Sequence, residues 1–197
     1  MVKSKAKHSH LVDCPKNITI GAIIVSSSRY KELREGKPLS DKSLPIFREV
    51  FSKSSFLDTD AQYRIEFEKI IPDDPSQIER IIKDYAIPDK INVLIFSGGT
   101  GITKKDITIE TVTPFFDKEM PGFGEVFRHL SYQDIGNSTI LSRATAGVIN
   151  NTIVFLIPGS SGAVKTALKD IIQPELPHVL SEIYREINRN KDEHQEM

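Results

Sequence analysis

Two glycine-rich segments are the parts of this sequence best suited to bind an anion. One runs from Ser97 to Gly101 and the other from Pro158 to Gly162, and each directly follows an apolar run. Glycine lets the backbone approach a ligand closely, and the N–H groups that open a following helix favour negative charge. Each segment alone would also suit a tight turn, but two of them favour a phosphate or carboxylate site. Its candidate ligands are Ser97, Gly98, Gly99, Thr100, Gly101, Pro158, Gly159, Ser160 and Ser161.

Neither segment matches a standard nucleotide motif. The stretch from Gly98 to Lys104 lacks the spacing and the terminal Gly-Lys-Ser/Thr of a P-loop. The triplet Gly99-Thr100-Gly101 has no third glycine for a dinucleotide fingerprint. The sequence therefore disfavours a kinase or a dehydrogenase.

Carboxylates lie next to these segments. Asp106 stands five residues beyond Gly101, where it either caps the next helix or holds Mg2+ against phosphate oxygens. In isolation, capping would be the favoured role. Asp73 and Asp74 follow another apolar run, and Asp74 precedes Pro75 as a good helix cap. This leaves Asp73 free, so we expect Asp73 and Asp106 to be the functional pair.

Three other places carry groups suited to an anion site. Glu125 ends the turn that begins at Pro121, and it would also suit the first turn of a helix. Ser142 and Arg143 place a hydroxyl beside a fixed positive charge, although Arg143 could equally be a surface residue. Ser27 is the second residue after the apolar run that ends at Val25.

Alternating strands and helices must position these residues. Apolar runs predict strands over Ile18–Val25, Phe67–Ile71, Ile91–Phe96 and Ile153–Ile157. Helical spacing predicts helices within Ser40–Phe51 starting near Ser43, and over Pro75–Tyr85, Ile107–Phe116, Glu125–Leu130, Ala163–Ile172 and Val179–Ile187. This alternation predicts an α/β fold with a mostly parallel sheet covered on both faces. Parallel strands would bring the four strand exits to one edge, where ligands bind in such sheets.

Composition indicates an ordinary globular protein. The chain has 197 residues, 39% hydrophobic content and a formal net charge of −1. We expect a disordered leader over residues 1–16, one domain over 17–187 and a polar tail over 188–197. The balanced charge gives no reason to expect nucleic acid or a membrane surface as partner.

The single cysteine, Cys14, excludes an internal disulfide and suits a reducing compartment. No apolar run approaches the roughly 20 residues that span a membrane, and the basic start lacks a signal-type apolar core. We therefore expect a cytoplasmic protein.

The chain resembles the MoaB/Mog family of molybdenum-cofactor biosynthesis proteins, in particular its MoaB-like branch. The resemblance covers roughly residues 17–187, and the order and number of its motifs make it specific. The motifs are Asp41-Lys-Ser43, Ile71-Pro-Asp73-Asp74, Ser97-Gly-Gly-Thr-Gly101 with Asp106, Met120-Pro-Gly-Phe-Gly-Glu125, Leu141-Ser-Arg143 and Leu156-Ile-Pro-Gly-Ser160, followed by Ala163-Val164.

The resemblance implies a three-layer α/β/α fold that binds molybdopterin, a pterin dithiolene with a terminal phosphate. Active relatives adenylylate that phosphate with Mg-ATP and release pyrophosphate. The carboxylates linked to this step and to Mg2+ map onto Asp106 and Asp73, and the glutamate of the glycine turn maps onto Glu125. The resemblance also implies a homotrimer or homohexamer and a downstream metal-insertion protein as partner.

Two departures from the family pattern keep a second function open. Many relatives carry an aspartate after the serine of the first exit, where this chain has Ser27. The last loop, Gly159–Gly162, also differs from the family's usual residues. The alternative function is a molybdopterin-binding module without adenylyltransferase activity. The neighbouring branch that inserts the metal fits less well, because its chains usually carry additional domains.

Overall fold

The structure is a computed structural model that describes residues 13–52 and 61–195. A mixed sheet of six strands forms its centre, in the order β2-β1-β3-β6-β5-β4. The strands are β1 (Asn17–Val25), β2 (Gln62–Ile71), β3 (Val93–Ser97), β4 (Lys118–Glu119), β5 (Thr145–Ile149) and β6 (Thr152–Ile157). Strands β2, β1, β3 and β6 are parallel, as the alternation predicts, whereas β5 runs antiparallel to β6.

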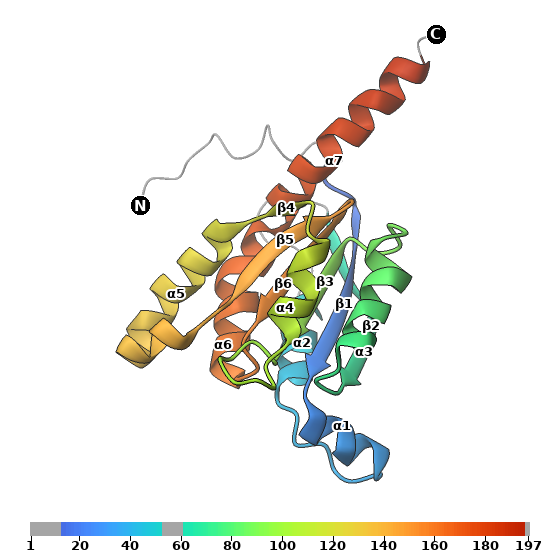
Figure 1. The fold of residues 1–197 in the computed structure, drawn as a ribbon. Helices are drawn as coiled ribbons and strands as arrows, with labels where there is room; N and C mark the ends of the chain where they lie inside the picture. Colours follow the sequence, from blue (N-terminus) through green and yellow to red (C-terminus); the bar gives the residue numbers. More distant parts are fainter. Residues whose placement is uncertain (1–12, 53–60, 196–197) are drawn as a thin grey trace.

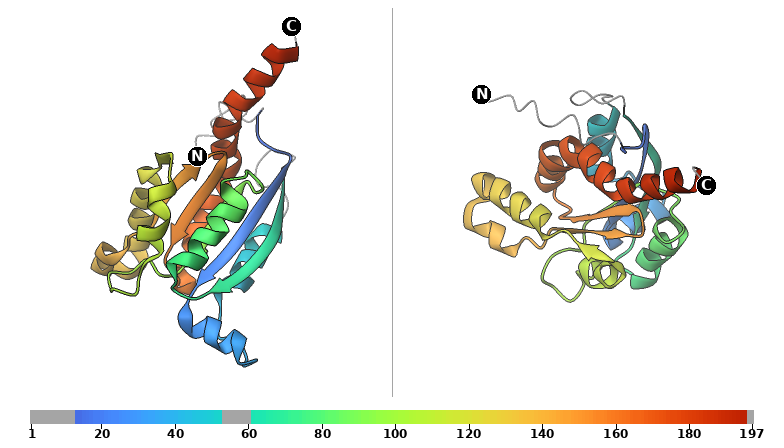
Figure 2. Two further views of the ribbon diagram at one scale, coloured as in Figure 1. Left: turned by 45° about the vertical axis from the view of Figure 1, so that its right-hand side comes forward. Right: turned by 90° about the horizontal axis from the view of Figure 1, so that it is seen from above.

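Helices lie on both faces of the sheet (Figures 1 and 2). The α-helices are α1 (Ser27–Arg34), α2 (Ser43–Ser52), α3 (Pro75–Ile81), α4 (Thr108–Val112), α5 (Pro121–Ile135), α6 (Ser161–Lys165) and α7 (Gln173–Gln195). Two π-helical segments, η2 (Ile82–Ala86) and η5 (Thr166–Ile172), extend α3 and α6, and two 3-10 segments are η3 (Thr113–Phe115) and η4 (Gly136–Leu141).

Alternation along β1 builds two separate cores. Ile20 and Ile24 pack with α2, α5, α6 and α7 on one face, whereas Ile23 and Val25 pack with α3 and α4 on the other. Every side chain of β3 and β6 is buried, because helices cover both of their faces. The three-layer α/β/α fold implied by the sequence is therefore confirmed.

The strand predictions missed two strands, β4 and β5, and shortened another. β2 begins at Gln62 instead of Phe67, so it includes Tyr63 and Ile65, which alternate with charged residues as on a half-buried edge strand and were not counted in the predicted apolar run. β5 was not predicted, because it is only five residues long and contains Gly147. A turn at Asn150, with a φ of +50°, joins β5 to β6.

The helix predictions erred mainly in length. α1 was not predicted, and α5 runs from Pro121 to Ile135 instead of from Glu125 to Leu130. α7 begins at Gln173 and continues to Gln195, so its helix passes through most of the segment 188–197 that we expected to be a tail. The expected disorder of the leader falls outside the described residues for positions 1–12. None of the helices in the described ranges is long and apolar enough to cross a membrane.

The topology of the sheet determines where a site can form. β1 lies between β2 and β3, and the helices that follow β1 and β2 cover opposite faces of the sheet. Chains that diverge in this way leave a crevice at the carboxyl ends of the strands. The segments after β1 and β3, which begin at Ser26 and Gly98, lie at this crevice.

Candidate functional site

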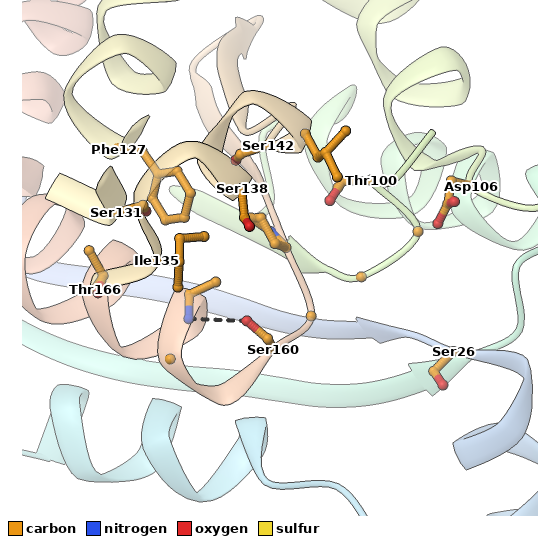
Figure 3. A pocket seen from close by; sticks show the side chains of 18 of the residues that line it. Ser26, Thr100, Asp106, Phe127, Ser131, Ile135, Ser138, Ser142, Ser160 and Thr166 are labelled. Atoms are coloured by element: carbon orange, nitrogen blue, oxygen red, sulfur yellow. Dashed lines mark hydrogen bonds between the residues drawn. The ribbon is translucent and has the colours of Figure 1, made fainter. Parts of the chain in front are cut away.

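A pocket of about 610 Å³ lies at the carboxyl edge of the sheet (Figure 3). The exits of β1, β3 and β6 form its floor, and α5 and η4 form a wall. Its lining residues are Ser26, Ser28, Arg29, Ser40, Gly98, Gly99, Thr100, Gly101, Asp106, Phe127, Ser131, Asp134, Ile135, Ser138, Leu141, Ser142, Pro158, Gly159, Ser160, Gly162, Ala163 and Thr166. This volume suits a small organic ligand.

The glycine loop after β3 requires glycine at its first two positions. Gly98 has a φ of +108°, and a Cβ there would lie 2.3 Å from the carbonyl oxygen of Val25. Gly99 has a φ of +63°, and a Cβ there would lie 2.3 Å from the hydroxyl of Thr108. That hydroxyl donates to the Gly98 carbonyl at 2.8 Å, so the loop is fixed to the start of α4.

The second glycine loop packs against the first. A Cβ on Gly159 would lie 3.1 Å from the Cα of Gly98. Ser160 caps α6, because its hydroxyl accepts from the Ala163 N–H at 3.3 Å (Figure 3). The structure thus brings together the two segments that the sequence selected as candidate anion sites.

Asp106 lies in the pocket wall and remains ionised. Its Oδ2 accepts from the Thr103 hydroxyl at 2.6 Å and from the Thr103 N–H at 2.9 Å. The side-chain hydrogen bond from Thr103 is the main cause that lowers the pKa of Asp106. Desolvation, the second-largest effect, opposes it, and backbone N–H donors and the charge of Arg143 lower the pKa further. Asp106 therefore offers a charged carboxylate to a ligand.

The lowered pKa of Asp106 makes a testable prediction. Because its pKa is lower in the folded protein than in the unfolded chain, its stabilising contribution is present above the unfolded pKa and is lost as pH falls through the folded pKa. We expect a 13C NMR titration of the Asp106 carboxyl to give a pKa below its ordinary value. Thr103→Val, which removes the principal donor, should move that pKa upward.

Thr111→Val is the matched control for this titration. Its hydroxyl donates to the carbonyl of Ile107, the residue before α4, at 2.7 Å, and is not among the hydrogen-bond donors to Asp106 in the described residues. We expect no change in the Asp106 titration in this variant. An unchanged midpoint in Thr103→Val would contradict the assignment of Thr103 as the main cause.

Asp73 is not free, contrary to the sequence-based expectation. Its Oδ2 accepts from the Ser27 hydroxyl at 2.7 Å and from the Ser27 N–H at 2.9 Å. Asp74 takes the predicted capping role, since its carboxylate accepts from the Ser76 N–H. Asp73 does not line the pocket, but its Oδ1 would lie 3.2 Å from a Cβ on Gly99, so it stands behind the glycine loop.

Arg143 contacts protein groups on both sides. Its Nε donates to the Thr100 carbonyl at 3.1 Å, and its two terminal nitrogens donate to the Glu110 carboxylate at 2.5 and 3.3 Å. Hydrogen bonding to Arg143 is the main cause that lowers the pKa of Glu110. The arginine thus holds the glycine loop against α4, and it does not line the pocket.

The remaining candidates divide between the pocket and its surroundings. The Ser142 hydroxyl lines the pocket and is buried without a hydrogen-bond partner in the described structure. The hydroxyl of Ser97 is also buried and unpartnered, but Ser97 lies beneath the loop at the end of β3. Glu125 is exposed on α5, and neither it nor Ser161 lines the pocket.

Sequence reasoning missed the wall formed by α5 and η4. Phe127, Ser131 and Ile135 lie one helical turn apart along α5 and line one end of the pocket (Figure 3). Ser138 and Leu141 continue this wall from η4. The only signal in the sequence is that Phe127, Ser131 and Ile135 are four residues apart. The predicted helix ended at Leu130, so it did not include the last two of them.

The charged groups of the pocket fit a magnesium site shared with a ligand. Among the described residues, no group of three or more His, Cys, Asp or Glu side chains is placed to hold a metal ion. Mg2+ commonly uses one or two carboxylates and completes its shell with water and substrate phosphates. The ionised Asp106 beside the glycine loops fits that donor set.

Comparisons with known proteins agree with this geometry. Residues 21–178 match the family described as "Probable molybdopterin binding domain". Molybdenum cofactor biosynthesis protein B of Bacillus subtilis (strain 168) is 42% identical over 178 residues, which cover 90% of this chain and 96% of that protein. The corresponding Staphylococcus carnosus protein is 37% identical over 179 residues, or 90% and 98% of the two chains.

A solved structure has the same fold. The tungsten cofactor synthesizing protein MoaB from Pyrococcus furiosus is 40% identical to this chain and superposes with a TM-score of 0.70. The match covers 86% of this chain and 99% of that one. The similarity therefore extends over the elements that build the pocket.

Proposed function

Since this chain belongs to the MoaB-type molybdenum cofactor biosynthesis proteins, in the family of "Probable molybdopterin binding domain" sequences, we propose that it adenylylates the terminal phosphate of molybdopterin with Mg-ATP. The observation that carries the proposal is the meeting of two glycine loops and the ionised Asp106 in one pocket. Backbone N–H groups suit phosphates, and a wall with Phe127 and Ile135 suits a flat organic ring.

The reaction requires positioning more than covalent help from the protein. A terminal phosphate oxygen of the pterin attacks the α-phosphorus of ATP and forms a new P–O bond. The bond from that phosphorus to the oxygen bridging to the β-phosphorus breaks, and pyrophosphate leaves with the electron pair. The glycine loops would hold the two phosphates in line, and the hydroxyls of Thr100 and Ser142 would donate to their oxygens.

Asp106 would be the principal ligand of Mg2+, which when bound supplies positive charge to the ATP oxygens. Asp73 is the second proposed carboxylate, placed behind Gly99 by its hydrogen bonds to Ser27. Thr103 donates a hydrogen bond to Asp106, and Ser27 donates one to Asp73. These hydrogen bonds would hold both carboxylates beside the glycine loops.

The direct test is a product assay with purified protein, molybdopterin and Mg-ATP. We expect adenylylated molybdopterin and pyrophosphate in equal amounts, both dependent on the pterin. Product that forms without the protein, or none with it, would refute the enzymatic function.

A binding module without transfer activity is the second candidate. The observation in its favour is that Asp73 is already engaged by Ser27 and lies outside the pocket lining. Calorimetry separates the two functions. Binding of molybdopterin with no affinity for Mg-ATP would favour the module, whereas binding of both favours the enzyme.

We also propose that the chain assembles as a homotrimer or homohexamer. Several large apolar side chains are exposed near the end of α5 and on η4, with Tyr132 59% and Ile140 85% exposed. Such a concentration is typical of a surface that another chain covers. Light scattering should give three or six times the chain mass of 22.2 kDa, and Ile140→Ser should lower that mass. A monomeric wild-type protein would contradict this proposal.

A further inference from the structure

Among the described residues that line the pocket, Arg29 alone has a cationic side chain. It lies in the first turn of α1, directly after β1, and none of the sequence motifs placed it in the site. The pocket otherwise offers hydroxyls, backbone groups and the carboxylates of Asp106 and Asp134. Because the other charged lining residues are carboxylates, the most negative part of a ligand is favoured next to Arg29.

A buried carboxylate orients the guanidinium of Arg29. The Asp41 side chain is only 3% exposed, and its Oδ1 lies 3.5 Å from the Arg29 Nε. The Oδ2 of Asp41 accepts from the N–H groups of Ser43 and Leu44 at 3.1 and 2.8 Å, so Asp41 is itself fixed at the start of α2. The contact with Asp41 uses the Nε of Arg29, and within the described residues no hydrogen bond or ion pair takes up its two terminal nitrogens.

The other carboxylate near Arg29 is occupied. Glu32, one turn further along α1, accepts from both the N–H and the hydroxyl of Ser40 at 2.9 Å. These hydrogen bonds are the main cause that lowers the pKa of Glu32, and the charge of Arg29 adds to them. The Glu32 carboxylate is therefore turned toward the loop that ends at Ser40. In the described residues it makes no hydrogen bond to the terminal nitrogens of Arg29.

The pocket is consequently polarised from end to end. Ser26 and Asp106 lie at one end, and the apolar wall with Phe127 and Ile135 lies at the other (Figure 3). Arg29 and the hydroxyls of Ser26 and Ser28, which lie 3.1 Å apart, belong to the end formed by β1. The glycine loops occupy the middle, where the reacting phosphates would meet.

From this arrangement we propose that Arg29 binds the β- and γ-phosphates of the nucleotide, the part that leaves as pyrophosphate. The assignment rests on the proposed function for the identity of its ligand. It implies that the polyphosphate lies along α1 and that the ring of a ligand lies along α5. A guanidinium suits this task, because its planar fork pairs with two phosphate oxygens at once.

Calorimetry with inorganic pyrophosphate and with AMP, both in the presence of Mg2+, tests this subsite. We expect Arg29→Gln to weaken pyrophosphate binding by about tenfold or more, because a charge-assisted pair is lost. AMP, which lacks the β- and γ-phosphates, should bind with nearly unchanged affinity. Arg29→Lys, which keeps the charge without the fork, should fall between wild type and Arg29→Gln.

Arg34→Gln is the matched control, because Arg34 lies on the same helix, carries the same charge and does not line the pocket. It should bind both ligands and unfold as the wild type does. Arg29→Gln also leaves the buried Asp41 without its ion-pair partner, so we expect it to unfold at a lower temperature, and its unchanged affinity for AMP shows that the pocket is still formed. Equal losses for AMP and pyrophosphate in Arg29→Gln, or an equal loss in Arg34→Gln, would overturn the assignment.

The outcomes separate this inference from the proposed reaction. If the product assay fails but Arg29→Gln selectively weakens pyrophosphate binding, the subsite stands and the transfer activity does not. If the wild type forms adenylylated product while Arg29→Gln binds pyrophosphate as tightly as wild type, the reaction stands and the subsite is refuted.

Discussion

Replacing Asp106 by Asn is expected to lower the rate of adenylyl transfer by roughly 100- to 1000-fold. The substitution keeps the size of the side chain but removes the charge that Thr103 holds in its ionised form. The proposed Mg2+ then loses its principal protein ligand, and the charge that develops on the leaving phosphates is no longer offset. Single-turnover assays over a range of Mg2+ concentrations would measure the loss and its partial recovery at high Mg2+.

Asp74→Asn is the control for this prediction. Asp74 is a partly buried carboxylate that caps α3, and asparagine serves equally well at such a position. We expect its activity to match the wild type. A rate within a few-fold of wild type in Asp106→Asn would exclude Asp106 from the reaction.

Replacing Gly98 by Ala is expected to destabilise the fold by about 3 kcal/mol and to abolish ligand binding. The added Cβ would lie 2.3 Å from the Val25 carbonyl oxygen, and backbone cannot yield there as a flexible side chain would. The φ of +108° also disfavours any L side chain. Urea unfolding followed by circular dichroism, together with calorimetry on the variant, would measure both effects.

Gly122→Ala provides the contrast. Gly122 lies in the first turn of α5, and nothing lies within 4 Å of a Cβ at that position. Alanine favours the helix over glycine by about 1 kcal/mol, so this variant should be as stable as wild type or slightly more so. Comparable losses in the two variants would show that Gly98 has no special conformational role.

The helices and strands that could be predicted from the sequence are those whose buried apolar side chains recur at regular spacing. β1, β3 and β6 are continuous apolar runs because helices cover both of their faces, and the loops that follow them come together as expected. α1 was missed because none of its residues is buried, so no apolar periodicity marks it. β5 was missed because a short strand with a glycine carries little pattern of its own.

The same physical limit applies to the site. The glycine loops could be predicted because glycine at strand ends has a local conformational cause. The contact of Arg143 with Glu110 and the contact of Asp73 with Ser27 join residues 33 and 46 positions apart, so only the fold reveals them. The pocket wall on α5 was missed for a different reason, because the helix predicted over Glu125–Leu130 ends before Ser131 and Ile135, which continue the face that begins at Phe127.

The helix α1 projects from the edge of the sheet and buries none of its residues in either core (Figure 1). Tyr30 packs partly buried against one core, and polar contacts supply the rest, chiefly Arg29 with Asp41, Ser27 with Asp73 and the backbone of Ser26 with Ile71. Dissolved salt weakens an exposed ion pair, whereas it leaves apolar packing largely intact. The Asp41 side chain is only 3% exposed, so salt screens the Arg29–Asp41 pair less than an exposed pair, and dissolved ions reach this end of the pocket mainly through the 23% exposed Arg29 side chain.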